Sequence, residues 1–248
     1  MISDADRERF AAARDEAIAR EKAAGGIGQL NERTLHAAVK LYLAPGAENR
    51  EVRIGRRTAD VFGESGVVEI QTRSWEKLLP KLAEFLPVTD VTAVLPVAVT
   101  RRVWWTDPGT GAVSGGRKSP VTGTAFSALE EIAKLGPWLD HPSLTVRVMF
   151  FDVDDYRVRT VRRGRASSVR TDRVPADLRD ECFVRSVADL AALLPPGLPE
   201  EFTAADLRRL GRVRAVTAGR IASALLRAGL TERLADRGRA YVYRIRTK

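Results

Sequence analysis

The order of apolar and polar positions along the chain predicts its secondary structure. Apolar residues recur at helical spacing in 30–43, 74–86 and 125–139. Extended patterns rich in β-branched residues fall at 50–62, 67–72, 88–99 and 144–158, and DPGTG marks the turn of a hairpin over 101–119. Helices interleaved with strands in this order predict an α/β fold, with a mixed sheet flanked by helices.

The two ends of the chain have patterns of their own. Residues 1–25 mix acids and bases on a helical period and end at paired glycines, which predicts a charged helix. LLPPGLPEE is a Pro/Gly-rich connector, and two helical segments and a hairpin follow it. We therefore expect a helix over 1–25, a sheet domain over 26–160, an Arg-rich segment and linker over 161–199, and a small domain over 200–248.

Composition restricts the class of protein. Hydrophobic residues make up 44% of the 248 residues and charged residues 29%, which excludes a largely disordered chain. The sequence holds no apolar run near the roughly 20 residues that span a bilayer, and its N-terminus is charged, unlike a secretory signal. The single Cys182 excludes an internal disulfide, so we expect a cytoplasmic protein.

Charge gives the first functional indication. Lys and Arg number 41 against 32 Asp and Glu, a net charge of +9. Such an excess is typical of proteins that bind nucleic acid, because phosphate contacts release counterions, although an Arg-rich coding bias produces it as well. The bases gather in 157–173, which hold seven arginines and one acid, and again in 207–248.

Two carboxylates on neighbouring predicted strands are the candidate chemistry. Alternation places Glu69 and Gln71 on one face of their strand, and the GESG turn brings Asp60 beside Glu69. Adjacent carboxylates repel each other unless a hard divalent cation lies between them. Mg²⁺ or Mn²⁺ bound there could activate water for attack on a phosphodiester, and Glu32 is a third acid in the preceding helix.

These residues resemble a known nuclease superfamily. Glu32 in NERTLH, Asp60 in RRTADVF and Glu69 in VVEIQT, with the order of elements over 27–158, resemble the PD-(D/E)XK superfamily, also called the restriction-endonuclease-like fold. The resemblance implies that Asp60, Glu69 and the Ile70 carbonyl bind the metal. It also implies that Glu32 supports the metal through water.

One position departs from the superfamily pattern. Gln71 stands where the superfamily usually has a lysine, and it can position water but carries no charge to stabilise an anion. Some members of the superfamily use a base that has migrated from a nearby helix. Lys77 and Arg73 are the candidates here, and Arg73 also suits a phosphate contact.

Plainer interpretations stand beside these. Asp60 could pair with Arg56 or Arg57 while Glu69 is a solvated strand residue. His36, on a helix with apolar neighbours, is interpreted as a packing or hydrogen-bonded residue rather than a base.

The predicted hairpin over 101–119 joins aromatic and basic residues. Trp104 and Trp105 either contact a ligand or pack against the sheet, and alternation lets at most one of them face a given ligand. Arg117 and Lys118, on the second strand, are candidates for contact with DNA phosphates.

The C-terminal segment resembles a winged-helix domain, through ADLRRLG, TAGRIASALLRAGL and the terminal RGRAYVYRI. The resemblance implies a helix that can lie in a DNA groove and a basic wing. The residues it assigns to DNA binding are Thr217, Arg220, Ser223 and Arg227 on the helix and Arg237 and Arg239 on the wing. Winged helices also dock proteins and form dimers, so that alternative stays open.

Taken together, the sequence predicts a cytoplasmic, Mg²⁺- or Mn²⁺-dependent DNA endonuclease with a winged-helix DNA-binding domain. One alternative is a catalytically inactive nuclease-like scaffold that binds DNA or regulates. Another is a subunit of a larger DNA-processing or defence assembly, with the charged N-terminal helix docking a partner. A homodimer is also open, and the sequence leaves the form of the nucleic acid undecided.

Overall fold

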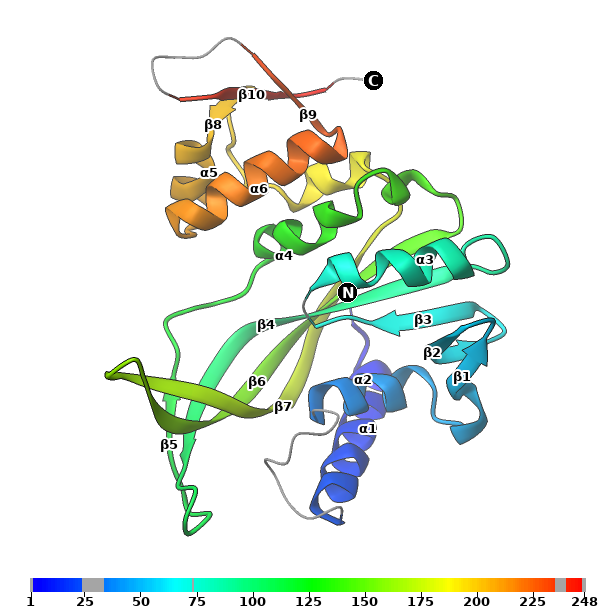
Figure 1. The fold of residues 1–248 in the computed structure, drawn as a ribbon, viewed down its shortest axis with the longest axis vertical. Helices are drawn as coiled ribbons and strands as arrows, with labels where there is room; N and C mark the ends of the chain where they lie inside the picture. The colour runs from blue at the N-terminus through cyan, green and yellow to red at the C-terminus, as the bar shows by residue number, and fades with distance from the viewer. Residues whose placement is uncertain (1, 24–33, 73, 235–239, 247–248) are drawn as a thin grey trace.

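The computed structural model describes residues 2–23, 34–72, 74–234 and 240–246. It shows an α/β fold in which a mixed seven-stranded sheet has the order β1-β2-β3-β4-β6-β7, with β5 paired to β4 (Figure 1). The β3–β4 and β4–β6 pairs are parallel and the other pairs antiparallel. The strands are β1 (Arg50–Ile54), β2 (Arg57–Gly63), β3 (Gly66–Ile70), β4 (Val91–Thr106), β5 (Val113–Lys118), β6 (Leu144–Arg162) and β7 (Arg165–Val184).

Helices cover both faces of this sheet. Those before β4 are α1 (Asp4–Ala23), α2 (Thr34–Leu43), the 3-10 helices η1 (Ala47–Asn49) and η2 (Trp75–Lys77), and α3 (Leu79–Phe85). Those that follow β5 are α4 (Ala125–Ile132) and the 3-10 helix η3 (Ala133–Asp140). The helices α1 and α2 share one buried cluster with the sheet, through Phe10, Val39 and Phe151 among others. Because their apolar faces meet the sheet, the charged face of α1 is left to solvent.

Strand β7 fixes both N-terminal helices. The Asp172 carboxylate accepts hydrogen bonds from the backbone N–H of Thr34 at 3.2 Å and from its hydroxyl at 2.6 Å, at the start of α2. The Arg14 guanidinium of α1 donates to the Ala176 carbonyl at 2.8 Å. A carboxylate at the first turn of a helix satisfies free N–H groups and complements the helix dipole.

The opposite face of the sheet carries a second core that continues into the C-terminal domain. Leu82 of α3 and Leu129 of α4 pack in the same buried cluster as Val148 of β6. That cluster also holds Ile221 and Leu225 of the C-terminal helix α6 (Ala215–Ala228). The small domain is therefore docked on α4 and η3 through buried apolar side chains.

The C-terminal domain is built from short elements around α6. They are the 3-10 helix η4 (Ala188–Leu193), β8 (Glu201–Thr203), α5 (Ala204–Gly211), β9 (Thr231–Arg233) and β10 (Val242–Ile245). The strands form an antiparallel sheet in the order β8-β10-β9. Thr203 and Asp206 cap α5 reciprocally, and Gly229 ends α6 with φ at 86°, as the sequence signals at these positions suggest.

The segment predicted as an Arg-rich linker, 161–199, differs most from its prediction. Residues 165–184 form β7, which pairs with β6 along its length. The arginines nearest the turn of this hairpin, from Arg159 to Arg165, are exposed, whereas Arg157, Arg170 and Arg173 are half-buried. With arginines on both kinds of position, the strand lacks the apolar alternation by which strands are recognised in a sequence. Towards its end Asp172, Pro175 and Leu178 are buried, but they lie three residues apart, because irregularities in the pairing with β6 break the two-residue period.

Three smaller differences concern boundaries. The extended segment 50–62 is two strands, because a two-residue turn at Gly55, with φ at 57°, folds β1 back on β2. The strand predicted at 88–99 and the first hairpin strand are one continuous β4. The helix predicted over 74–86 divides at Leu78 into η2 and α3, because Pro80 is tolerated only in the first turn of a helix.

Among the residues that the structure describes, none of the helices has the length and apolar character needed to cross a membrane.

Candidate active site

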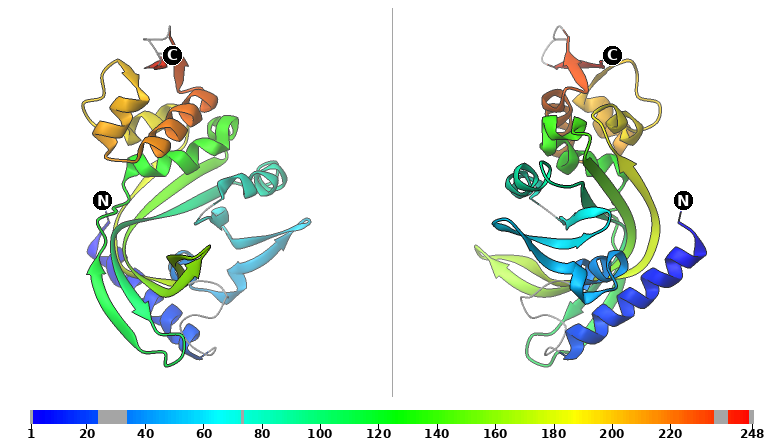
Figure 2. Two further views of the ribbon diagram at one scale, coloured as in Figure 1. Left: turned by 60° about the vertical axis from the view of Figure 1, so that its left-hand side comes forward. Right: turned by 90° about the vertical axis from the view of Figure 1, so that its right-hand side faces the viewer.

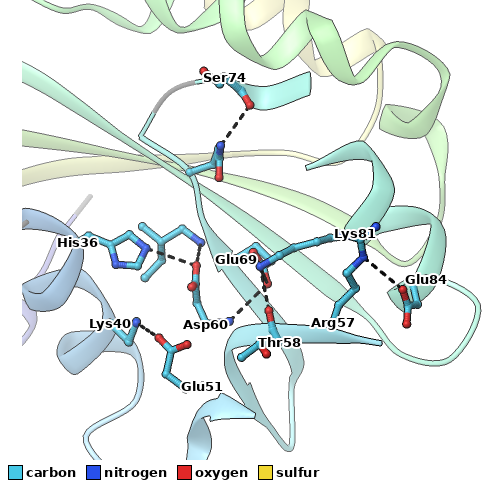
Figure 3. A network of polar contacts seen from close by, with 12 residues as sticks. His36, Lys40, Glu51, Arg57, Thr58, Asp60, Glu69, Ser74, Lys81 and Glu84 are labelled. Carbon is cyan, nitrogen blue, oxygen red and sulfur yellow. Dashed lines mark hydrogen bonds and ion pairs between the residues drawn. The ribbon is translucent and has the colours of Figure 1, made fainter. Parts of the chain in front are cut away.

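The antiparallel pairing of β2 with β3 brings the two predicted carboxylates together, as Figure 3 shows. The Ile70 N–H donates to the Asp60 carboxylate at 2.7 Å. The Asp60 N–H donates to Glu69 Oε1 at 3.3 Å. Each side chain therefore reaches across to the neighbouring strand, and the pair forms one polar patch on the β2–β3 hairpin.

Glu69 is almost fully buried, with a relative exposure of 2%, and a lysine reaches it from α3. The Lys81 ammonium donates to both Glu69 oxygens, at 2.7 and 2.9 Å, and to the Thr58 carbonyl at 2.8 Å. Burial, and then the charge of Asp60, raise the pKa of Glu69 to about 7, although Lys81 opposes the shift. Glu69 is thus poised to change protonation near neutral pH.

The pKa of Asp60 is shifted in the opposite direction, below its usual value. Burial alone would raise its pKa, but the hydrogen bond and charge of His36, the Ile70 N–H and the charge of Lys40 together lower it. His36 Nε2 lies 3.4 Å from Asp60 Oδ2. Two neighbouring carboxyl groups whose pKa values are pushed apart are a frequent property of sites that move protons or hold cations.

Lys40 places a second cation near this pair, and this one is buried. Its side chain is 7% exposed, on α2, and its ammonium forms an ion pair with Glu51 of β1. The α2 helix therefore supplies both His36 and Lys40 to one side of Asp60, whereas α3 supplies Lys81 to Glu69 (Figure 3).

Gln71 has a structural contact in the loop after β3. Its side-chain amide donates to the Ser74 backbone carbonyl at 3.2 Å, and the Gln71 backbone carbonyl accepts from the Trp75 indole at 3.0 Å. Trp75 is fully buried, so these contacts tie the loop to the core. Ser74 precedes η2, makes no side-chain cap there and adopts φ at 58°.

The other catalytic candidates are placed differently. Glu32 and Arg73 lie outside the described residues. Lys77 is exposed on η2, next to the charge of Glu76. The lysine that reaches Glu69 is Lys81, which the sequence reading did not single out.

The sequence analysis looked for a base on the segment after the acidic strand and named Lys77 and Arg73, whereas the lysine of this segment that contacts Glu69 is Lys81. The division between η2 and α3 changes which positions of that segment face the sheet, so a continuous helix over 74–86 could not identify it.

The plainer interpretations of the acid pair do not hold. Arg57 pairs with Glu84, at 3.4 Å, and the Arg56 N–H also donates to Glu84. Glu69 is buried rather than solvated. His36, interpreted as a hydrogen-bonded residue, does contact a side chain, and that side chain is Asp60.

The fit to a metal ion can be tested on these residues. In the described ranges no three or more His, Cys, Asp and Glu side chains come together in a metal-binding group. Mg²⁺ commonly takes only one or two carboxylates and keeps its remaining ligands as water. Asp60 and Glu69 supply two carboxylates, and Ile70, which offers a carbonyl, follows Glu69 in the chain. These residues meet that smaller requirement and so fit Mg²⁺ or Mn²⁺.

The candidate DNA contacts on β5 lie on the surface. Arg117 and Lys118 are both exposed. The Trp104 indole donates to Asp154 at 2.9 Å and its ring stacks on Tyr156, so Trp104 packs on the sheet. The Trp105 ring is covered by the Arg159 guanidinium, 5.0 Å from its centroid.

The candidate contacts on α6 border a groove. Arg220, Ser223 and Arg227 are exposed, whereas Thr217 is half-buried. A hollow of about 840 Å³ lies between α6, the start of α5, the end of α4 and the strand β10, and these three exposed residues line it. Arg237 and Arg239 of the predicted wing lie outside the described residues.

Comparison with known proteins gives the chain a family. Residues 33–185, more than half the chain, match the model of a domain of unknown function, DUF8091. The chain belongs to this family. The DUF8091 region begins at α2 and ends just after β7, so it contains the whole sheet and the Asp60–Glu69 pair.

A relative from Treponema pallidum (strain Nichols) matches beyond the DUF8091 region. It is called "Uncharacterized protein" and is 30% identical over 223 residues, which cover 88% of this chain and 87% of that protein. No solved structure matches the chain. These matches show no nuclease family, so the resemblance to PD-(D/E)XK enzymes rests on the site and the order of elements.

Proposed function

We propose that this DUF8091 protein is a metal-dependent DNA endonuclease of the PD-(D/E)XK type. The single observation that carries the proposal is the pairing of half-buried Asp60 with buried Glu69 on the β2–β3 hairpin, with Lys81 on Glu69. The order α2-β1-β2-β3-α3-β4 around it supports a restriction-endonuclease-like core. A carboxylate pair can hold a metal ion that assists phosphodiester hydrolysis, and a lysine can stabilise the charge that develops on the phosphate.

The surroundings of each residue indicate the role that it would have. Asp60, with its lowered pKa, stays ionised and would hold a divalent ion together with Glu69 and the Ile70 carbonyl. Such an ion polarises the phosphate and lowers the pKa of its bound water. Lys81, which contacts both Glu69 oxygens, is the cation at this site that would stabilise the charge on a phosphate.

DNA binding is assigned to the basic surfaces. The order β8-β10-β9, with α5 and α6 between β8 and β9, supports a winged-helix arrangement. Arg220 and Arg227 would contact phosphates from α6, and Arg117 and Lys118 from β5. The net charge of +9 supports nucleic acid as the partner.

Cleavage of a substrate panel tests the proposal. Purified protein is incubated with plasmid, linear duplex, single-stranded and branched DNA and with RNA, each with Mg²⁺, Mn²⁺ or EDTA. We expect metal-dependent cleavage of DNA, reduced at least about 100-fold in Asp60→Asn and Glu69→Gln proteins, as when one stabilising group is lost. Equal cleavage by wild type and Asp60→Asn protein would refute the site.

A second candidate function is an inactive DNA-binding scaffold. Lys81 occupies both oxygens of Glu69, and the Gln71 amide contacts the Ser74 carbonyl, which favours a structural role for these residues. Salt-sensitive DNA binding without cleavage under any of the metal conditions would support this candidate over the nuclease.

A further inference from the structure

The hairpin of β6 and β7 extends beyond the sheet as a two-stranded arm. Strand β4 accompanies β6 only as far as the Trp105–Arg157 pair. Beyond it, residues 158–162 pair with 165–169 alone, from Val158–Val169 to Arg162–Arg165. We call residues 158–169 the arm. Figure 1 shows it projecting from the end of the sheet.

The arm is basic and exposed. It contains Arg159, Arg162, Arg163 and Arg165 and not one Asp or Glu. These four side chains are all exposed, and Val161 is 76% and Val169 56% exposed. A hollow of about 550 Å³ at the tip is lined by Arg162, Arg163 and Arg165 together with Ala166 and Ser167. The arm therefore presents positive charge to solvent, with two exposed valines between the arginines.

Positive charge also exceeds its counterions at the root of the arm. Asp155 is fully buried, and its carboxylate accepts hydrogen bonds from the Arg173 guanidinium at 2.6 and 3.1 Å and from the Arg157 guanidinium at 3.5 Å. Arg101 is half-buried beside them, and its Nε has no hydrogen-bond partner. Burial and the charge of Arg173 lower the pKa of Arg101. Three guanidinium groups therefore gather around one carboxylate, and an anion would relieve their repulsion.

The shape of the arm fits a double helix. Its strands are five residues long, or about 17 Å at 3.4 Å per residue. The major groove of DNA is about 12 Å wide and admits a two-stranded β-ribbon. Single-strand binding instead relies on aromatic side chains that stack on bases, and 158–169 contain none.

The arm and the candidate site share one face of the molecule but lie at opposite ends of the sheet. In both views of Figure 2 the arm projects to the same side as the β1–β2 hairpin, whereas α1 lies on the other side. Figure 1 shows the arm at one end of the sheet and β1 and β2 at the other, so a duplex that contacts both would cross this face.

We infer that the β6–β7 arm binds double-stranded DNA by contacting phosphates of the DNA backbone. This contact is separate from the one proposed for α6. The choice of DNA rests on the proposed nuclease function. The binding itself does not, because it requires neither the metal nor the acid pair.

The test compares two triple variants of the full chain with equal loss of charge. The arm variant is Arg162→Ala/Arg163→Ala/Arg165→Ala. The control is Arg9→Ala/Arg20→Ala/Lys22→Ala, three exposed bases on α1. Fluorescence anisotropy in EDTA measures binding to a short duplex DNA, to one strand of it and to a duplex RNA of the same sequence, each over a range of salt.

We expect the arm variant to bind duplex DNA at least about tenfold more weakly, with a log–log salt slope flatter by about 3, because three phosphate contacts are lost. The control should keep the wild-type affinity and slope. An unchanged arm variant, an equal loss on single strand and duplex, or a larger loss on duplex RNA than on duplex DNA would each overturn the inference.

In this design the failure of the arm inference can be distinguished from the failure of the nuclease proposal. Arm-dependent binding without metal-dependent cleavage would remove the nuclease proposal and leave the arm as a duplex contact. Metal-dependent cleavage by a protein whose affinity for duplex DNA is unchanged in the arm variant would remove the arm inference and leave the nuclease proposal.

Discussion

Glu69 and Asp60 carry the same functional group, yet their surroundings move their pKa values in opposite directions. The Asp60 carboxylate contacts the His36 imidazole and accepts a hydrogen bond from a backbone N–H, whereas Glu69 is buried between the sheet and α3. The ionised form of Glu69 is therefore the costly one, and it is held by Lys81. This asymmetry predicts how stability and activity depend on pH.

Stability without metal should fall as the pH rises through neutrality. The folded protein keeps a proton on Glu69 up to a pKa of about 7, whereas the unfolded chain loses it near 4.5. The folded state binds more protons between these values, so the free energy of unfolding decreases from pH 5 to pH 8, by up to about 3 kcal/mol. Urea unfolding in EDTA measures it.

Glu69→Gln protein should lose this pH dependence, since its amide does not titrate. Glu64→Gln, at an exposed turn position, should keep it. Parallel curves for wild type and Glu69→Gln between pH 5 and pH 8 would show that Glu69 has an ordinary pKa.

Lys81 provides a second prediction at the residue scale. Replacing it with alanine removes the cation beside the acid pair, and we expect kcat to fall at least about 100-fold while DNA affinity changes little. Lys22→Ala, on the far helix α1, serves as the control.

Loss of cleavage in Lys77→Ala protein, with Lys81→Ala protein still active, would instead restore the sequence prediction. Thermal unfolding of each variant separates a chemical effect from a folding one.

At the scale of elements, α5 depends on its cap. The Thr203 hydroxyl and the Asp206 carboxylate satisfy each other's backbone N–H groups. Thr203→Ala should lower the free energy of unfolding by about 1 kcal/mol, and Thr203→Ser should cost less because serine also caps well. Urea unfolding of the two variants checks this, and an equal loss in both would mean that the methyl group of Thr203, not the cap, is responsible.

The elements also show what sequence patterns can reveal. The helices, the β2–β3 acid pair, the β4–β5 hairpin and the Thr203 cap were all predictable, because each rests on local periodicity or turn chemistry. The arm was not, because its arginines hide the alternation of a strand. The position of Lys81 was not either, since it depends on how α3 packs over β3.

At the scale of the whole molecule, the small domain is fixed to the sheet domain. Ile221 and Leu225 of α6 belong to the same buried cluster as Leu129 of α4. The sequence placed a connector between the two domains, and no local pattern could show that their apolar faces meet. A duplex bound to α6 therefore has a fixed direction relative to the acid pair.

This shared core predicts joint unfolding. All four tryptophans precede residue 139, so their fluorescence reports on the sheet domain. Leu225→Ala, in α6, should nevertheless lower the stability read from tryptophan fluorescence by about 2–5 kcal/mol, because it opens a cavity in the common cluster. Val216→Ala, at a position 65% exposed on the same helix, should have little effect.

A tryptophan transition unmoved by Leu225→Ala, with a separate change in far-UV circular dichroism, would show that the domains unfold independently.

The hydrogen bonds from Thr34 to Asp172 have a consequence for synthesis of the chain. They join residues 138 positions apart, and Arg14 of α1 reaches Ala176, 162 positions away. While the ribosome is still translating the middle of the protein, these partners on β7 do not exist. The contacts that hold the first two helices to β7 therefore cannot form until β7 has emerged. Nascent chains shorter than this are the form most in need of a chaperone.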